Sequence, residues 1–176
     1  MVSKSIFRNF IPIFLLLNSL FSSAQQRIPS IEVYFFLQPD CPISQQYTPI
    51  INAFFTKEKS TSDITRISLV FSTSEGNQFE KSVKGFISKY GMEMPYRIDK
   101  NYAFAKKLQA TITPEVFVLV DGMIKYHGAI DNMYARLGVK RAETTEFYLQ
   151  EAISAIRNGL TPPYAFKEPL GCFIEY

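Results

Sequence analysis

The stretch IEVYFFLQPDCPIS, residues 31–44, decides the fold that we expect for this chain. Its first seven residues form an almost uninterrupted apolar run, which is typical of a strand buried on both faces of a sheet. Residues 38–40 interrupt this run, and apolar residues then recur at helical spacing from Ile43 to Phe55. The sequence therefore predicts a buried strand, a turn, and a helix that begins at Cys41.

The start of a helix favours a reactive thiol at Cys41. The first backbone N–H groups of a helix have no partner within it, and the helix dipole favours negative charge there. A thiol in this place loses its proton more easily, and the thiolate is the reactive form. Pro42 suits the first helical turn, and the Ser44 hydroxyl can donate a hydrogen bond to the thiolate, whereas the carboxylate of Asp40 opposes it. The alternative is a small buried cysteine without chemistry.

Strands and helices alternate along the rest of the chain. The expected strands are residues 64–71, 94–98, 115–120 and 123–126, and the expected helices are residues 79–90, 102–108 and a last helix capped by Thr144 and ending near Gly159. Asp121-Gly122 predicts a hairpin turn between the last two strands. This order predicts an α/β fold in three layers, with a central mixed sheet and helices on both faces.

Three motifs, in this order, resemble those of thioredoxin-like redoxins. Asp40-Cys-Pro-Ile-Ser44 resembles the redox turn, with Pro49 at the place of the proline that kinks the first helix. Ile112-Thr-Pro-Glu-Val-Phe117 resembles the threonine–cis-proline turn that faces the cysteine, and residues 122–131 resemble the closing hairpin. The resemblance implies a thioredoxin-like fold from about residue 31 to 171. It also implies that Pro114 shapes the facing surface and leaves nearby backbone groups free to pair with an extended substrate.

The chain is most similar to a subgroup within the alkyl hydroperoxide reductase and thiol-specific antioxidant superfamily. That subgroup carries an Asp-Cys-Pro-Ile-Ser turn and a late Gly-Cys-x-Ile, which is Gly171-Cys-Phe-Ile174 here. Two departures limit what the resemblance implies. Ser44 stands where dithiol thioredoxins have their second cysteine, so a two-cysteine cycle within the turn is impossible. Tyr34 and Gln38 stand where typical peroxiredoxins have proline and threonine or serine, which argues against peroxidase activity.

Cys172 is the only other cysteine of the chain. Two cysteines in an exported protein suggest a pair, and our hypothesis is that Cys172 reaches Cys41 as its resolving or locking partner through a reversible disulfide. A permanent staple that fixes the tail is an equal alternative, and a third is that the two cysteines never meet. The lone His127 is expected to be structural or solvent-facing. No spacing supports a soft metal site with the cysteines, so no metal and no cofactor are expected.

The stretch before the last helix is rich in charged residues. Asp131, Lys140 and Arg141 belong to it, and we expect a solvated loop.

The first 24 residues have the pattern of a signal peptide. Lys4 and Arg8 precede an apolar stretch at residues 10–21, and Ser22-Ser-Ala24 supplies the small residues that signal peptidase requires. The prediction is an exported protein, periplasmic or secreted, whose domain spans residues 25–176 with a C-terminal tail. It would have no stable membrane insertion after cleavage, although an uncleaved anchor is the alternative.

The charge balance of the chain limits the classes of partner that we expect. Without the first 24 residues the chain has 17 basic and 16 acidic side chains, and this near-neutral balance gives no basis for binding nucleic acid. The helix start at Cys41 and the resemblance to thioredoxin-like redoxins predict thiol–disulfide exchange with protein or small-molecule thiols and disulfides. Cys41, Ser44, Pro114 and Cys172 would form the site. A thiol peroxidase and a non-catalytic binding module with the same fold are the alternatives.

Overall fold

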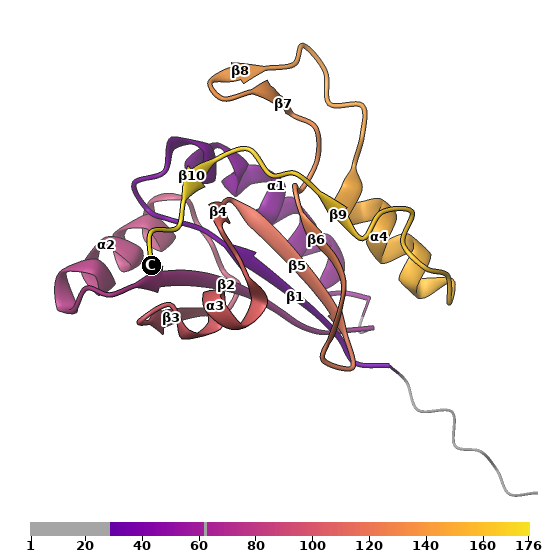
Figure 1. The fold of residues 1–176 in the computed structure, drawn as a ribbon, viewed down its shortest axis with the longest axis horizontal. Helices are drawn as coiled ribbons and strands as arrows, with labels where there is room; N and C mark the ends of the chain where they lie inside the picture. The colour runs from indigo at the N-terminus through magenta and orange to yellow at the C-terminus, as the bar shows by residue number, and fades with distance from the viewer. Residues whose placement is uncertain (1–28, 62) are drawn as a thin grey trace, which may run out of the picture.

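The computed structural model describes residues 29–61 and 63–176 (Figure 1). The expected signal peptide lies outside these described residues. None of the helices in this part of the chain has the length and apolar character to cross a membrane.

A mixed sheet of six strands forms the centre of the fold (Figure 1), in the order β3-β2-β1-β5-β6-β9. Strands β1, β2 and β3 are parallel to one another, β5 is antiparallel to β1, and β6 is antiparallel to β5. The strands comprise β1 (Ile31–Phe36), β2 (Ile64–Thr73), β3 (Tyr96–Lys100), β5 (Glu115–Val120), β6 (Met123–Gly128) and β9 (Phe166–Lys167). The buried run that opens the chain's fold is therefore β1, near the middle of the sheet, as predicted.

Helices cover both faces of this sheet. The helices are α1 (Pro42–Glu58), α2 (Asn77–Lys89), α3 (Ala103–Leu108) and α4 (Tyr148–Arg157). Because side chains alternate along a strand, Val33 and Phe35 of β1 pack in one core with residues of α1, α2 and α4. Tyr34 and Phe36 pack on the opposite face with α3. The three-layer α/β architecture predicted from the sequence is thus confirmed.

Two small pairs of strands lie outside the main sheet. Strand β4 (Ile112–Thr113) pairs with β10 (Cys172–Phe173), and β7 (Tyr134–Arg136) pairs with β8 (Val139–Lys140). The C-terminal segment after α4 first pairs through β9 with β6 and then reaches β4 through β10 (Figure 1). This path brings the end of the chain to the start of α1.

The predicted start of the last helix is wrong. Helix α4 begins at Tyr148, and its N-cap residue, Phe147, makes no side-chain capping hydrogen bond. Thr144 does not cap it, because the side chain of Asn132 accepts hydrogen bonds from the backbone N–H groups of Thr145 and Glu146 and holds them in a loop. A contact between positions 13 residues apart decided this boundary.

The prediction of a solvated loop before α4 is wrong for Asp131. Its side chain is buried, and it accepts hydrogen bonds from the Tyr47 hydroxyl at 2.7 Å and from the backbone N–H of Met133 at 2.9 Å. Lys140 and Arg141 are exposed, as expected, although Lys140 belongs to β8. The third strand in chain order starts later than predicted, since β3 begins at Tyr96 and not at residue 94.

Candidate functional site

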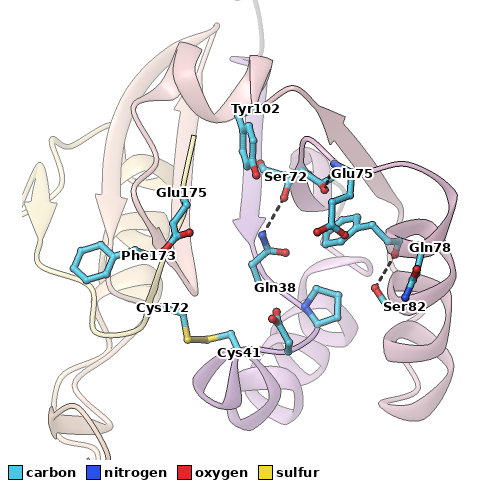
Figure 2. A pocket seen from close by; sticks show the side chains of 14 residues that line it. Gln38, Cys41, Ser72, Glu75, Gln78, Ser82, Tyr102, Cys172, Phe173 and Glu175 are labelled. Carbon is cyan, nitrogen blue, oxygen red and sulfur yellow. Dashed lines mark hydrogen bonds between the residues drawn. A yellow bond between two sulfur atoms is a disulfide. The ribbon is translucent and has the colours of Figure 1, made fainter.

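Cys41 and Cys172 are joined by a disulfide, which lies where the tail crosses the start of α1 (Figure 2). Their Cα atoms are 6.0 Å apart, within the range that a disulfide requires. The hypothesis that the two cysteines pair is confirmed, and the alternative that they never meet is wrong. Both cysteines of the chain are used in this bond.

Cys41 is the N-cap residue of α1. Its backbone is extended, with φ −75° and ψ 114°, and its carbonyl accepts the hydrogen bond of Gln45 N–H. The backbone N–H of Ser44, which has no partner within the helix, points at the Cys41 sulfur and lies 3.5 Å from it. Pro42 occupies the first helical turn, as predicted. This geometry would stabilise a negative charge on the sulfur.

The side chain of Ser44 stabilises the turn before the helix. Its hydroxyl oxygen accepts a hydrogen bond from the backbone N–H of Gln38 at 3.3 Å, which fixes the chain between β1 and α1. In the disulfide form the contact between Ser44 and the sulfur is made by the backbone N–H. Donation from the hydroxyl to a thiolate stays a prediction.

The turn that contains Thr113 and Pro114 lies beside Cys41. The peptide bond between Thr113 and Pro114 is cis, and the Thr113 carbonyl oxygen lies 3.2 Å from the Cys41 sulfur. Cys41 is therefore held between the helix start and the turn before β5. Its exposed fraction is only 2%.

The backbone beside Pro114 is occupied in this structure, which corrects one expectation. The resemblance implied free backbone groups there, but Cys172 pairs with Thr113 and Phe173 pairs with Ile112 in an antiparallel ladder. The backbone N–H of Ile174 donates to the carbonyl of Thr111 at 2.8 Å. The chain's own tail fills the place because the disulfide fixes Cys172 directly beside β4.

Glu115 is a residue of the site that the sequence analysis did not single out. It follows Pro114, and its carboxylate accepts hydrogen bonds from the backbone N–H groups of Thr111 and Ile112, at 3.1 and 3.5 Å. Nδ1 of His127 lies 3.2 Å from its other oxygen. Burial raises the pKa of Glu115, although the pairing with His127 opposes this shift. The available signal was a single acidic residue at the start of an otherwise apolar strand.

His127 has a structural role here. Its ring pairs with Glu115 and packs against the rings of Phe117 and Phe166, with centroids 5.1 and 4.8 Å away. Within residues 29–61 and 63–176, no group of three or more His, Cys, Asp or Glu side chains is placed to hold a metal ion.

A pocket of about 530 Å³ opens beside the disulfide (Figure 2). Polar and apolar side chains both line it, and they come from the turn before α1, the end of β2 and the loop after it, α2, Tyr102 and the tail. Asp40, Glu75 and Glu175 contribute three carboxylates to it. The pocket provides space for a reacting group next to the two sulfur atoms.

Among the comparisons with known proteins, only the search of solved structures found similar chains, and these share the fold. No family model matches the chain, and no curated protein matches it. An uncharacterized conserved protein from Geobacillus kaustophilus is 20% identical, with a TM-score of 0.67 over 84% of this chain and 77% of that one. A hypothetical protein from Sinorhizobium meliloti 1021 is 23% identical, with a TM-score of 0.67 over 83% and 79%.

A thioredoxin-like protein solved in its oxidized form is also similar. It is 17% identical, with a TM-score of 0.49 over 57% of this chain and 67% of that one. The sheet order, the helix that starts at Cys41 and the turn at Pro114 define the class: the chain has a thioredoxin-like α/β fold.

Proposed function

We propose that this protein is an exported thiol–disulfide redox protein in which Cys41 and Cys172 alternate between a disulfide and two thiols. The observation that carries the proposal is the bond between a cysteine at a helix N-terminus and a cysteine on a two-residue strand of the tail. A bond between these positions can open while the sheet and its helices keep their packing.

Exposure favours attack on Cys172 when the disulfide is reduced. Cys172 is partly exposed, whereas Cys41 is shielded. An external thiolate bonds to the Cys172 sulfur, the S–S bond breaks, and its electron pair stays on Cys41, which leaves as a thiolate. A second external thiolate then frees Cys172, and the two external thiols end as one disulfide.

The reverse direction, in which the protein is oxidised and its substrate disulfide is reduced, uses the same groups. The Cys41 thiolate attacks a substrate disulfide and forms a mixed disulfide, and one substrate sulfur leaves as a thiolate. The Cys172 thiolate then attacks Cys41, which releases the second substrate thiol and restores the internal disulfide. Ser44 and Pro114 act as positioning residues, at the helix start and at the facing turn. Protein or small-molecule thiols and disulfides are the partners.

Export belongs to the proposal because of the first 24 residues of the sequence. Their pattern fits a signal peptide, and a compartment outside the cytosol lets disulfides persist.

A permanent staple in a non-catalytic binding module is the second candidate function. Two observations favour it: Cys41 is almost completely buried, and Ile174 of the tail is part of a core cluster. The thiolate character of Cys41 separates this candidate from the first.

A pH titration of Cys41 alkylation, with the protein reduced and with Cys172→Ser, tests the proposed function. We expect a midpoint below the ordinary thiol value of about 8.5, because the helix start stabilises the thiolate. Cys41→Ser, which leaves Cys172 as the single thiol, is the matched control and should titrate near the ordinary value.

Two results would contradict the proposal. A Cys41 midpoint at or above about 8.5, together with a native disulfide that resists thiol reductants, indicates the staple. Peroxide consumption that disappears in Cys41→Ala indicates a peroxidase, in which Cys41 passes through a sulfenic acid.

A further inference from the structure

Residues 171–174 lie against β4 as an added strand. Cys172 and Phe173 pair antiparallel with Thr113 and Ile112, and Ile174 continues the ladder to Thr111. The side chain of Thr113 also lies 3.4 Å from the Cys172 carbonyl oxygen, to which its hydroxyl donates. An extended peptide that adds a strand to a sheet edge binds in this way, with its backbone giving affinity and alternate side chains giving specificity.

The position before the cysteine accepts only glycine. A Cβ atom on Gly171 would overlap the backbone carbonyl of Thr113 and would press on the side chain of Ile112. Backbone atoms of Thr113 cannot move without breaking the ladder, so any larger residue would lift the strand away from β4. The place beside β4 that residues 171–174 occupy, which we call the groove, therefore accepts only a glycine directly before the bonded cysteine.

The two positions after the cysteine differ sharply. Phe173 is 76% exposed, so the groove does not constrain this residue. Ile174 is 8% exposed and belongs to the core cluster formed by Phe36, Leu108 and Phe117, among others. The second position after the cysteine therefore has an apolar seat for a branched side chain.

We propose that, among protein disulfide substrates, this groove selects extended segments with glycine, cysteine, any residue and a branched apolar residue in that order. The tail is the chain's own copy of such a segment and occupies the site in the oxidised form. This inference rests on the proposed function, because the docked cysteine reacts with the Cys41 thiolate. Cys41 bonds to the docked sulfur as the substrate's S–S bond breaks, and the other substrate sulfur leaves as a thiolate.

The test measures how fast reduced Cys172→Ser protein reacts with peptides that reproduce residues 169–175. Each peptide carries its cysteine as a mixed disulfide with 2-nitro-5-thiobenzoate, whose release is read by absorbance, and mass spectrometry identifies the peptide bound to Cys41. Peptide changes equivalent to Gly171→Val and Ile174→Ser should each slow the reaction by about tenfold or more, through a steric clash and a lost apolar contact. The change equivalent to Phe173→Ser is the matched control and should leave the rate unaltered.

A second protein variant tests competition by the tail. In Gly171→Val/Cys172→Ser the added side chain displaces the tail, so the unchanged peptide should react several-fold faster than with Cys172→Ser alone. An equal or lower rate would contradict occupation of the groove by the tail.

Glutathione disulfide separates the two levels of the proposal, because it can react with the thiolate without filling the groove. If Cys41 reacts with glutathione disulfide but all peptides react equally fast, the groove does not select substrates and only this inference is overturned. If Cys41 reacts with neither, the proposed function fails and the inference fails with it.

Discussion

The carboxylate of Glu115 lies directly after Pro114, and the residue is only 2% exposed. It accepts the backbone N–H groups of Thr111 and Ile112, so it sets the path of the short strand that faces Cys41. Burial disfavours the charged carboxylate, and the pKa of Glu115 is therefore raised. The protonation of Glu115 thus couples the backbone path of β4, which faces Cys41, to pH.

Glu115→Gln should flatten the dependence of stability on pH. Because the native pKa of Glu115 lies above the ordinary glutamate value of 4.5, the folded protein binds a proton at this carboxyl more tightly than the unfolded chain does. The free energy of unfolding should then fall as pH rises from about 4.5 through the raised pKa, by at most about 1.4 kcal/mol for each pH unit. Denaturant unfolding between pH 4 and 7 measures this slope, and the variant's amide would carry no titrating proton at this position.

The exposed Glu143 provides the control for this measurement. Glu143→Gln should keep the slope of the unchanged protein. Equal slopes for the unchanged protein and Glu115→Gln would contradict the assignment of a buried, proton-binding Glu115.

At the scale of the elements, Arg157 connects three parts of the chain. It lies at the end of α4, and its guanidinium pairs with Glu58 at the end of α1 and with Asp63 just before β2. Glu58 is buried, with only 3% of its side chain exposed. The hydrogen bond from Arg157 lowers the pKa of Asp63 to about 2.

Arg157→Ala should lower the free energy of unfolding by about 2 kcal/mol at pH 7, because it leaves the buried carboxylate of Glu58 without its partner. The pH profile should change as well. A lowered native pKa means that Asp63 adds stability above about pH 4, which is lost as pH falls toward 2. Denaturant unfolding of both proteins between pH 2 and 7 should show a smaller acid loss in the variant.

Lys84→Ala removes one exposed positive charge from α2 and is the matched control. Its unfolding free energy should stay within about 0.5 kcal/mol of the unchanged protein. If Arg157→Ala behaves like Lys84→Ala, the connection between α1 and α4 does not contribute to stability.

The sequence predicts an element well where its signal is local and periodic. The buried run of β1, the apolar face of α1 and the Asp121-Gly122 hairpin were all predicted within one or two residues. The start of α4 was not, because a side chain from a distant loop, Asn132, holds the preceding residues. Strands β9 and β10 have two residues each and carry no period, so no sequence pattern could reveal them.

The same reasoning applies to the site. Cys41, Ser44 and Pro114 belong to motifs with fixed spacing, and pairing of two cysteines followed from their number. Glu115 and the added strand of the tail depend on packing between segments far apart in the chain. The predicted cysteine pair joined the tail to Cys41, but no sequence pattern predicted that the tail would pair as a strand with β4.

At the scale of the whole molecule, the tail crosses the fold and is fixed at two places. Gly128, with φ 119°, lies so close to the backbone of Lys167 that a Cβ atom would overlap it. The disulfide then fixes the tail to the start of α1, between cysteines 131 residues apart. The two core clusters pack the helices against the sheet, and only Ile174 joins them from beyond the disulfide.

Cys172→Ser should lower the free energy of unfolding by about 2–5 kcal/mol, since opening so long a loop restores much freedom to the unfolded chain. The variant should nevertheless stay folded at room temperature, because the packing of the sheet does not depend on the bond. Denaturant unfolding measures the loss, and limited proteolysis locates the change. Cleavage should appear first within residues 158–171 and leave residues 31–157 intact.

The unchanged protein, with and without reductant, is the control, and reduction should reproduce the cleavage pattern of the variant. Cleavage that begins throughout the sheet would show that the disulfide supports the whole fold. That result would contradict a bond that opens and closes during function.

The pairing of β10 with β4 also bears on solubility. Open strand edges invite other chains to pair with them, and proteins protect such edges with charges or with very short strands. Strand β3 carries Arg97 and Lys100 at one edge of the main sheet, and β9 at the other edge has only two residues. Strand β4 is covered by the tail alone in this part of the fold. A disulfide that holds residues 171–174 in place therefore also keeps the backbone groups of β4, itself only two residues long, from pairing with another chain.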